Sequence, residues 1–267
     1  IDFYLLHAVN KEKWDAMKEL GVVEYCAKLK EEGKIRYYGF SFHDDYEVFD
    51  EILHYRDWDF CQIQYNYMDT QEQAGDKGYA LAESLGVPLV IMEPIKGGSL
   101  ANFSEDINDR FHKMDPDRSV ASYALRWVGS HLNVKVILSG MSTMDQVEDN
   151  LKTFQDFSPL SEAEEKEIES ILTELRSRVQ NGCTGCRYCM PCPAGVNIPG
   201  NFKVWNNYHM YRTYDHVKWS WEKELKEEEK AKNCIKCGKC ETLCPQKLSI
   251  RDNLVQVQKD LDERIFK

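Results

Sequence analysis

The chain has 267 residues, of which 42% are hydrophobic, and its 45 acidic and 34 basic side chains give a net charge of -11. This balance argues against a nucleic-acid backbone as the main partner, because such binding depends on Lys and Arg neutralising phosphates; a basic partner or a neutral small molecule fits better. The length favours one large domain with a smaller appendage, and the absence of a run of about 20 apolar residues argues against a membrane span.

The first part of the chain alternates short β-rich runs with amphipathic stretches. We expect strands at residues 2–7, 35–41, 60–65, 88–93 and 134–138, and helices at 15–29, 46–53, 73–85 and 120–131. Repeated strand-then-helix units imply a parallel sheet covered by helices. The pattern fits two folds equally well: an open five-stranded sheet, or the later part of an eight-stranded β/α barrel. Because the chain begins with Ile1 inside a strand pattern, we expect it to be a fragment.

The remaining segments are mainly helical in pattern. A helix over 143–154 follows the last strand, and a Ser-x-x-Glu capping box opens another over 161–179, which Asn181-Gly182 stops. Aromatic residues recur over 202–232, where a dry face beside the cysteines and an ordinary helical core predict the same pattern. Ser249 is expected to cap a final helix.

Eight of the ten cysteines lie between Cys183 and Cys244, which indicates metal chemistry rather than a disulfide framework. The second run has the C-x2-C-x2-C-x3-C-P spacing of bacterial ferredoxins and comprises Cys234, Cys237, Cys240 and Cys244. The first run closes with x2 and comprises Cys183, Cys186, Cys189 and Cys192. Eight thiolates match the requirement of two 4Fe-4S clusters.

The fourth thiolate of such a run commonly ligates the other cluster. We therefore expect one cluster on Cys183, Cys186, Cys189 and Cys244, and a second on Cys234, Cys237, Cys240 and Cys192, with Gly238 permitting the turn. Two zinc sites or disulfides would also consume eight thiols, although zinc modules usually present two C-x2-C pairs. Cys26 and Cys61 lie in helix and strand patterns and are predicted to be small buried hydrophobes.

Five segments of the chain resemble the aldo-keto reductase family, and more closely its subgroup with a C-terminal 4Fe-4S domain. They are residues 1–7, 33–41, 62–66, 92–98 and 139–150. The resemblance implies an incomplete (β/α)8 TIM barrel built from the last five β/α units over residues 1–180. A mainly α-helical, ferredoxin-like domain with the two cysteine runs is expected over 181–267, in a cytoplasmic protein.

The family that the chain resembles reduces carbonyls with a nicotinamide cofactor through Asp, Tyr, Lys and His at the carboxyl ends of barrel strands. His7 matches the tetrad His, which orients the carbonyl and tunes the Tyr acid. Without the resemblance, a His ending a strand is more often a structural polar residue. His43 matches no tetrad position and is a candidate substrate or cofactor contact. Because Asp, Tyr and Lys of the tetrad are not matched, this chain alone is expected to be inactive.

The resemblance also assigns the cofactor contacts. Ser41 and Gln62 match the ligands of the nicotinamide carboxamide, while Phe42 stands where many relatives have Asn. The pyrophosphate loop, where glycines permit close approach, corresponds to Pro94, Ile95, Lys96, Gly97 and Gly98. The adenosine turn at a helix N-terminus corresponds to Gly140, Met141, Ser142, Gln146 and Asn150. Many relatives have Lys or Arg near 140 and 146 for a 2'-phosphate, so NADP over NAD rests on family expectation.

Two functions follow from these assignments. The first is an NAD(P)H-linked oxidoreductase that interconverts carbonyls and alcohols and carries two 4Fe-4S clusters. A hydride moves two electrons and each cluster one, so the clusters would serve an external redox partner protein or be structural. The second is an electron-carrier or interaction module in which the barrel is a scaffold, since a fold alone does not determine function.

Overall fold

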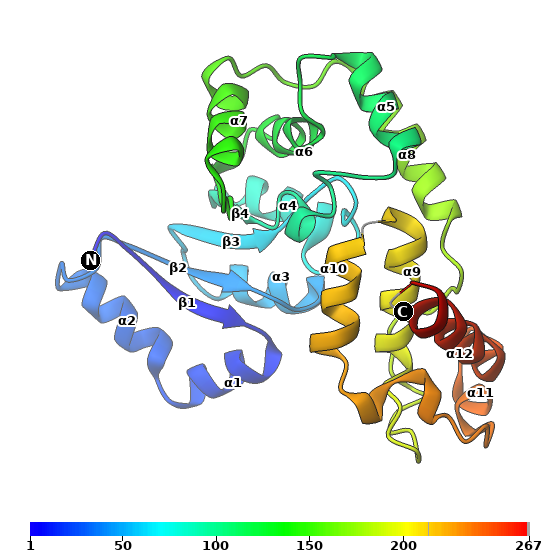
Figure 1. Ribbon diagram of the computed structural model, residues 1–267. Helices are drawn as coiled ribbons and strands as arrows, with labels where there is room; N and C mark the ends of the chain where they lie inside the picture. The colour runs from blue at the N-terminus through cyan, green and yellow to red at the C-terminus, as the bar shows by residue number, and fades with distance from the viewer. Residues whose placement is uncertain (213, 266–267) are drawn as a thin grey trace. The chain divides into compact units, whose positions relative to one another are not determined.

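The computed structural model describes residues 1–212 and 214–265 (Figure 1). The chain forms two compact units: the first is Ile1–Ala101 with Phe111–Glu162, and the second is Asn102–Arg110 with Ala163–Lys267. Helix α8 (Glu162–Ser177) falls almost entirely in the second unit, and the domain boundary expected at residue 180 stays a prediction. Within the described ranges, no helix combines the length and apolar character that a membrane crossing requires.

The first unit is built on a parallel sheet whose strands lie side by side in chain order. The strands are β1 (Phe3–Val9), β2 (Tyr37–Phe42), β3 (Phe60–Gln64), β4 (Leu89–Met92) and β5 (Val134–Ile137). Parallel pairing places the carboxyl ends of all five strands at one edge of the sheet. The predicted succession of strand-then-helix units is confirmed.

Helices connect successive strands. They are α1 (Lys11–Glu19), α2 (Val22–Glu31), α3 (Tyr46–Tyr55), α4 (Gly75–Ser84), the 3-10 turn η1 (Lys96–Gly98), α5 (Glu105–Met114), α6 (Val120–Gly129) and α7 (Met144–Gln155). The single helix expected over 15–29 is wrong. The chain breaks there at Gly21, whose φ of 68° is a left-handed conformation that favours glycine. Helix α5 was missed by the sequence analysis.

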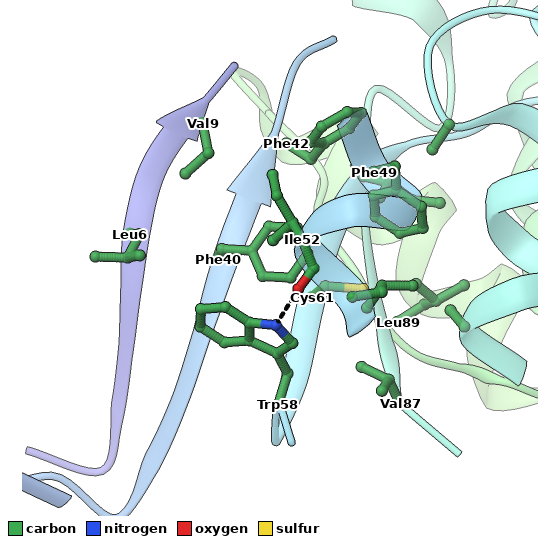
Figure 2. Close-up of a cluster of buried hydrophobic side chains, with 14 of the residues drawn as sticks. Leu6, Val9, Phe40, Phe42, Phe49, Ile52, Trp58, Cys61, Val87 and Leu89 are labelled. Atoms are coloured by element: carbon green, nitrogen blue, oxygen red, sulfur yellow. Dashed lines mark hydrogen bonds between the residues drawn. The ribbon is translucent and has the colours of Figure 1, made fainter. Parts of the chain in front are cut away.

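Helix α3 packs its apolar face on the sheet. Figure 2 shows Phe40 of β2 close to Phe49 and Trp58, and the indole Nε1 of Trp58 donates to the carbonyl oxygen of Ile52 at 2.8 Å. This bond satisfies the one polar group of the indole, so the ring can be buried without an unpaired donor. Cys61 lies in the same cluster, and its burial, like that of Cys26, confirms their prediction as core residues.

Both edge strands of the sheet expose apolar side chains. Phe3 on β1 is 66% exposed and Val136 on β5 is 47% exposed. A closed barrel removes such edges by pairing them. Five consecutive parallel β/α units with these edges constitute an incomplete (β/α)8 barrel, as predicted.

The second unit is mainly helical, as predicted. After α8 it contains α9 (Ile198–Tyr211), α10 (Tyr214–Trp219), the π-helix η2 (Ser220–Glu224), the 3-10 turns η3 (Glu227–Glu229) and η4 (Ala231–Asn233), α11 (Lys239–Leu243), α12 (Ile250–Gln258) and η5 (Lys259–Ile265). Asn197 caps α9 by accepting from the Gly200 amide at 3.2 Å. Ser249 precedes α12 as expected, but its side chain makes no capping hydrogen bond.

The aromatic residues of the second unit divide between core and surface. Phe202, Trp205 and Trp221 are buried, and the indole Nε1 atoms of the two tryptophans donate to Asp260 at 2.9 Å and Asp262 at 2.6 Å. By contrast, Trp219 is 56% exposed. The buried aromatic residues therefore build the helical core, and cysteines of both runs pack against that same core.

The close approach of β2 and β3 at Gly39 can be tested by adding a side chain there. A Cβ atom there would stand 2.4 Å from the carbonyl oxygen of Phe60, so we expect Gly39→Ala to lower the free energy of unfolding by about 1–3 kcal/mol. Urea unfolding followed by circular dichroism measures the change. The matched control is Gly140→Ala, because a Cβ at Gly140 meets nothing within 4 Å; equal stability of the two variants would contradict the packing argument.

Candidate functional site

Three residues expected at the first site lie at the carboxyl edge of the sheet. Ser41 of β2 pairs in register with Gln62 of β3, and His7 lies near the end of β1. The Ser41 hydroxyl is buried and accepts from the amide of Ala8 at 2.7 Å, while the Gln62 amide donates to the Met92 Sδ at 3.4 Å. The His7 side chain is exposed.

Four residues in the turn after β4 have left-handed backbone conformations. Glu93, Lys96, Gly97 and Gly98 have φ values of 54°, 49°, 61° and 97°. Two of these positions lack a side chain and permit the close approach of another group to the backbone. The residues expected to face a pyrophosphate, Pro94 to Gly98, thus form a compact turn immediately beyond the strand end.

A buried carboxylate anchors this turn. Asp69 is 6% exposed, and its two oxygens accept from the Lys96 Nζ at 2.6 Å and 2.5 Å. Asn66 joins them by donating to Asp69 and to the Glu93 carbonyl, both at 3.1 Å. The Lys96 ammonium is therefore engaged within the protein, and its contact with a cofactor stays a prediction. The role of Asp69 was not predicted from the sequence, where its only mark is that it is a polar residue shortly after a strand.

The turn after β5 is held by residues expected to contact adenosine. The Gln146 side-chain oxygen accepts from the amides of Ser142 at 2.6 Å and Thr143 at 3.2 Å, forming a capping box at the start of α7. The Asn150 amide donates to the Ser139 hydroxyl at 2.9 Å. Gly140 and Met141 are exposed. These side chains shape the turn, and their contact with a nucleotide stays a prediction.

Phe42 and His43 also lie at the carboxyl edge of the sheet, at the end of β2. Phe42 is fully buried, while His43 is exposed and donates its backbone amide to the Val9 carbonyl at 2.9 Å. The edge thus combines an exposed imidazole, a buried hydroxyl and two shaped turns from separate β/α units. Such a collection of polar groups on loops of a rigid sheet is typical of a ligand site.

The second candidate site is formed by the two cysteine runs, whose backbones share an unusual conformation. In the first run Gly185 and Arg187 have φ values of 72° and 62°; in the second run Lys236 and Gly238 have φ values of 57° and 80°. These residues flank the second cysteine of each run at corresponding positions. The expected turn at Gly238 is confirmed, and each loop also holds one non-glycine residue in the left-handed region, which costs about 1 kcal/mol.

The runs enclose two cavities. One is lined by four cysteines: Cys183, Cys186, Cys189 and Cys244. The other is lined by five: Cys192, Cys234, Cys237, Cys240 and, again, Cys189. Ile198 lines both cavities, so a thin wall of Cys189 and Ile198 separates them. Each cavity contains the four cysteines that the crossed arrangement groups together, Cys189 lines the second cavity as well, and the assignment of ligands to clusters stays a prediction.

The charge environment of the thiols shows the same grouping. Burial raises the pKa of Cys183 and of Cys189, and the neighbouring thiol of Cys244 raises both further. Burial likewise raises the pKa of Cys240, to about 11. Thiols crowded in apolar walls resist ionisation unless a cationic centre stabilises the thiolates.

The donor set fits 4Fe-4S clusters. Each cavity offers at least the four thiols that a cubane requires, and the remaining lining is largely apolar, including Phe202 and Leu248 in one and Leu254 in the other. All ten cysteines lie in the described ranges and none forms a disulfide. The residues would hold the clusters as thiolate ligands, and the clusters would supply one-electron chemistry.

One buried amide joins the helix that follows the first run to the segment that precedes the second. Asn201 on α9 is fully buried; it donates to the Glu229 and Asn197 carbonyls and accepts from the Ala231 amide, each at 2.8 Å. Every one of these bonds is made away from water, so each would be costly to lose. Asn201 therefore holds α9 against the chain that enters the second run.

Comparison with known proteins identifies both parts of the chain. The model of the aldo/keto reductase family matches residues 1–173, and that of the 4Fe-4S dicluster domain matches residues 182–248. No curated protein matches the chain. The two family matches confirm the resemblance inferred from the sequence motifs.

Solved structures match the first part. The aldo-keto reductase AKR11C1 from Bacillus halodurans, in its apo form, is 27% identical with a TM-score of 0.52, over 64% of this chain and 61% of that one. Its holo form is 26% identical with a TM-score of 0.52, over 64% and 58%. The glycerol dehydrogenase AKR11B4 from Gluconobacter oxydans shares the fold at 22% identity and a TM-score of 0.50, over 65% and 59%. The chain thus spans about three fifths of the length of these proteins.

The pair formed by Asp69 and Lys96 can be tested through stability. Asp69→Asn leaves the Lys96 ammonium without its carboxylate in a largely buried setting, and we expect the free energy of unfolding to fall by about 1–3 kcal/mol. Urea unfolding of the first unit measures it. Glu32→Gln is the control because its partner Lys34 is 66% exposed and such surface pairs contribute little to stability. A similar loss of unfolding free energy in both variants would contradict the proposal that Asp69 anchors the turn.

Proposed function

The chain belongs to the aldo/keto reductase family, and we propose that it forms part of an NAD(P)H-linked oxidoreductase that interconverts carbonyls and alcohols and holds two 4Fe-4S clusters. The observation that carries the cluster assignment is the pair of cavities, each lined by at least four cysteines drawn from both cysteine runs. Family membership supports the carbonyl chemistry, with a small-molecule carbonyl as substrate.

The sheet edge supplies the groups proposed for the cofactor. A bound nicotinamide cofactor supplies the hydride. Ser41 accepts a bond from Ala8, which leaves its hydroxyl hydrogen free to donate to the carboxamide. Gln62, its neighbour in register, is the second proposed carboxamide ligand. The turn from Pro94 to Gly98 would receive the pyrophosphate through backbone groups, since Asp69 engages the Lys96 ammonium.

The proposed catalytic residue of this chain is His7. Its exposure at the sheet edge leaves the imidazole free to orient a substrate carbonyl. The adenosine would lie at the turn of Gly140, Met141 and Ser142, near Gln146 and Asn150 at the start of α7. No cationic side chain occupies positions 140 or 146, so both NADP and NAD are compatible with this turn.

A second function is favoured by the geometry of the cavities. Because Cys189 and Ile198 line both, two clusters would be close neighbours, as suits one-electron exchange between them. The same chain could therefore act as an electron-carrier module whose barrel is a scaffold. The clusters would then serve a redox partner protein rather than the hydride reaction.

The crossed ligand arrangement makes a specific prediction for double variants. Anaerobically prepared protein should contain about eight iron and eight sulfide per chain. Cys192→Ala combined with Cys234→Ala removes two ligands of one cluster, so about four of each should remain. Cys192→Ala combined with Cys183→Ala removes a ligand from each cluster, and both should be lost. Iron and acid-labile sulfide analysis makes the comparison.

Cys26→Ala is the matched control, because it deletes a thiol that lies in the core of the first unit and lines neither cavity, and it should leave the iron content unchanged. The reverse outcome for the two double variants would establish that each run binds its own cluster. Zinc without sulfide in the parent protein would defeat the cluster assignment altogether.

Carbonyl turnover tests the reductase assignment. We expect this 267-residue chain to show no NADPH-dependent reduction of aldehydes or ketones, because the family's proton-donating Tyr is not matched in it. A chain that also carries the family's Asp, Tyr and Lys should be active, and His7→Gln should lower its kcat about 10- to 100-fold. Oxidation of NADPH followed by absorbance measures both, and turnover by the 267-residue chain would contradict the expectation that carbonyl reduction needs the unmatched Tyr.

A further inference from the structure

An open groove lies beside one of the two cysteine cavities. Its volume is about 600 Å³, and it is formed by the segment from Ala231 to Lys236 together with α12 and the start of η5. Its apolar lining includes Leu254 and Val255, the latter 44% exposed. Next to it on the chain, Ile235 is 66% exposed. The groove therefore offers apolar surface as well as depth.

The charged side chains lining the groove are all basic. They are Lys232, Lys236, Arg251 and Lys259, and no carboxylate lines it, in a chain whose net charge is -11. Lys232 pairs with Glu227, and Arg251 pairs with Glu241 at 2.7 Å, outside the groove lining. Lys236 and Lys259 are exposed and form no ion pair with any described side chain. The groove is thus a local cationic surface on an acidic protein.

This surface adjoins a proposed cluster. Cys234, Lys236, Arg251 and Leu254 line both the groove and the cavity of Cys234, Cys237 and Cys240. A partner seated in the groove would be separated from that cluster by little more than the Cys234 side chain. The other cysteine cavity shares no lining residue with the groove.

From this placement, we infer that the groove docks an acidic protein that carries single electrons. The inference rests on the proposed clusters and names the partner of that site. A cluster held by Cys234, Cys237 and Cys240 with Cys192 would accept one electron from the reduced carrier, which would itself be oxidised by one electron with no bond formed or broken. Charge complementarity accelerates the encounter, and the exposed apolar residues seat the partner next to Cys234.

The experiment uses the cluster-loaded chain and an acidic flavodoxin in its hydroquinone state, mixed by stopped flow under anaerobic conditions. The bleaching of cluster absorbance gives the bimolecular rate constant. Lys259→Glu should lower this constant about 3- to 10-fold at low ionic strength, and adding Lys236→Glu should lower it further, to about 10- to 100-fold. Raising the ionic strength to about 0.5 M should slow the parent protein and remove most of the difference.

Lys239→Glu is the matched control, because it makes the same charge change beside Cys240 but lies outside the groove lining. Lys239→Glu should change the rate constant by less than about 2-fold, because a charge outside the groove acts on the partner only through the overall electrostatic field of the protein, which salt screens. Photoreduced 5-deazariboflavin, a small neutral donor, should reduce the parent protein, Lys259→Glu and Lys239→Glu at one rate.

The outcomes separate this inference from the proposed function. Absence of iron and sulfide in the parent protein would defeat both. Intact clusters that 5-deazariboflavin reduces, with no effect of Lys259→Glu or an equal effect of Lys239→Glu, would overturn the docking surface alone. Saturable inhibition by inorganic phosphate at matched ionic strength would assign the groove to a small anion and also overturn it.

Discussion

Both cysteine cavities draw thiols from both runs, and this shared lining is the constraint on the second unit: one cavity takes three cysteines of the first run with Cys244, and the other takes three of the second run with Cys189 and Cys192. Because each cavity needs both runs, the segments between the runs must fold before either cavity is complete. Asn201 secures this arrangement by bonding to the chain just before the second run. The left-handed residues at corresponding positions give the two loops the same local shape.

The first unit obeys a different constraint, the parallel pairing of its strands. Pairing in chain order brings residues from distant segments to one edge, as with Ser41 and Gln62. Turns after β4 and β5 then complete the edge, each held by internal bonds such as those of Asp69 and Gln146. A rigid sheet that carries function on its loops allows reactive groups to vary without loss of the core.

The functions proposed for the two units differ in electron chemistry. A nicotinamide site exchanges electron pairs as hydride, whereas iron-sulfur clusters exchange electrons singly. The docking surface inferred beside Cys234 would give the proposed clusters a route to an outside carrier that does not require the hydride site. On this proposal, one-electron centres can occur on a chain of a hydride-transfer family because the cluster unit has a partner surface of its own.

The sequence by itself determined the β/α succession, the two cysteine arrays and their resemblance to known families, because periodicity and cysteine spacing are local properties of the chain. The local glycine signal for the break at Gly21 was overlooked, and helix α5 and the exposure of Trp219 were not predicted from the sequence. Only the tertiary structure decided that Asp69 engages Lys96, that Asn201 ties α9 to the second run and that four cations share one groove. Each of these joins residues that no local pattern relates, because packing of the whole unit sets which side chains meet.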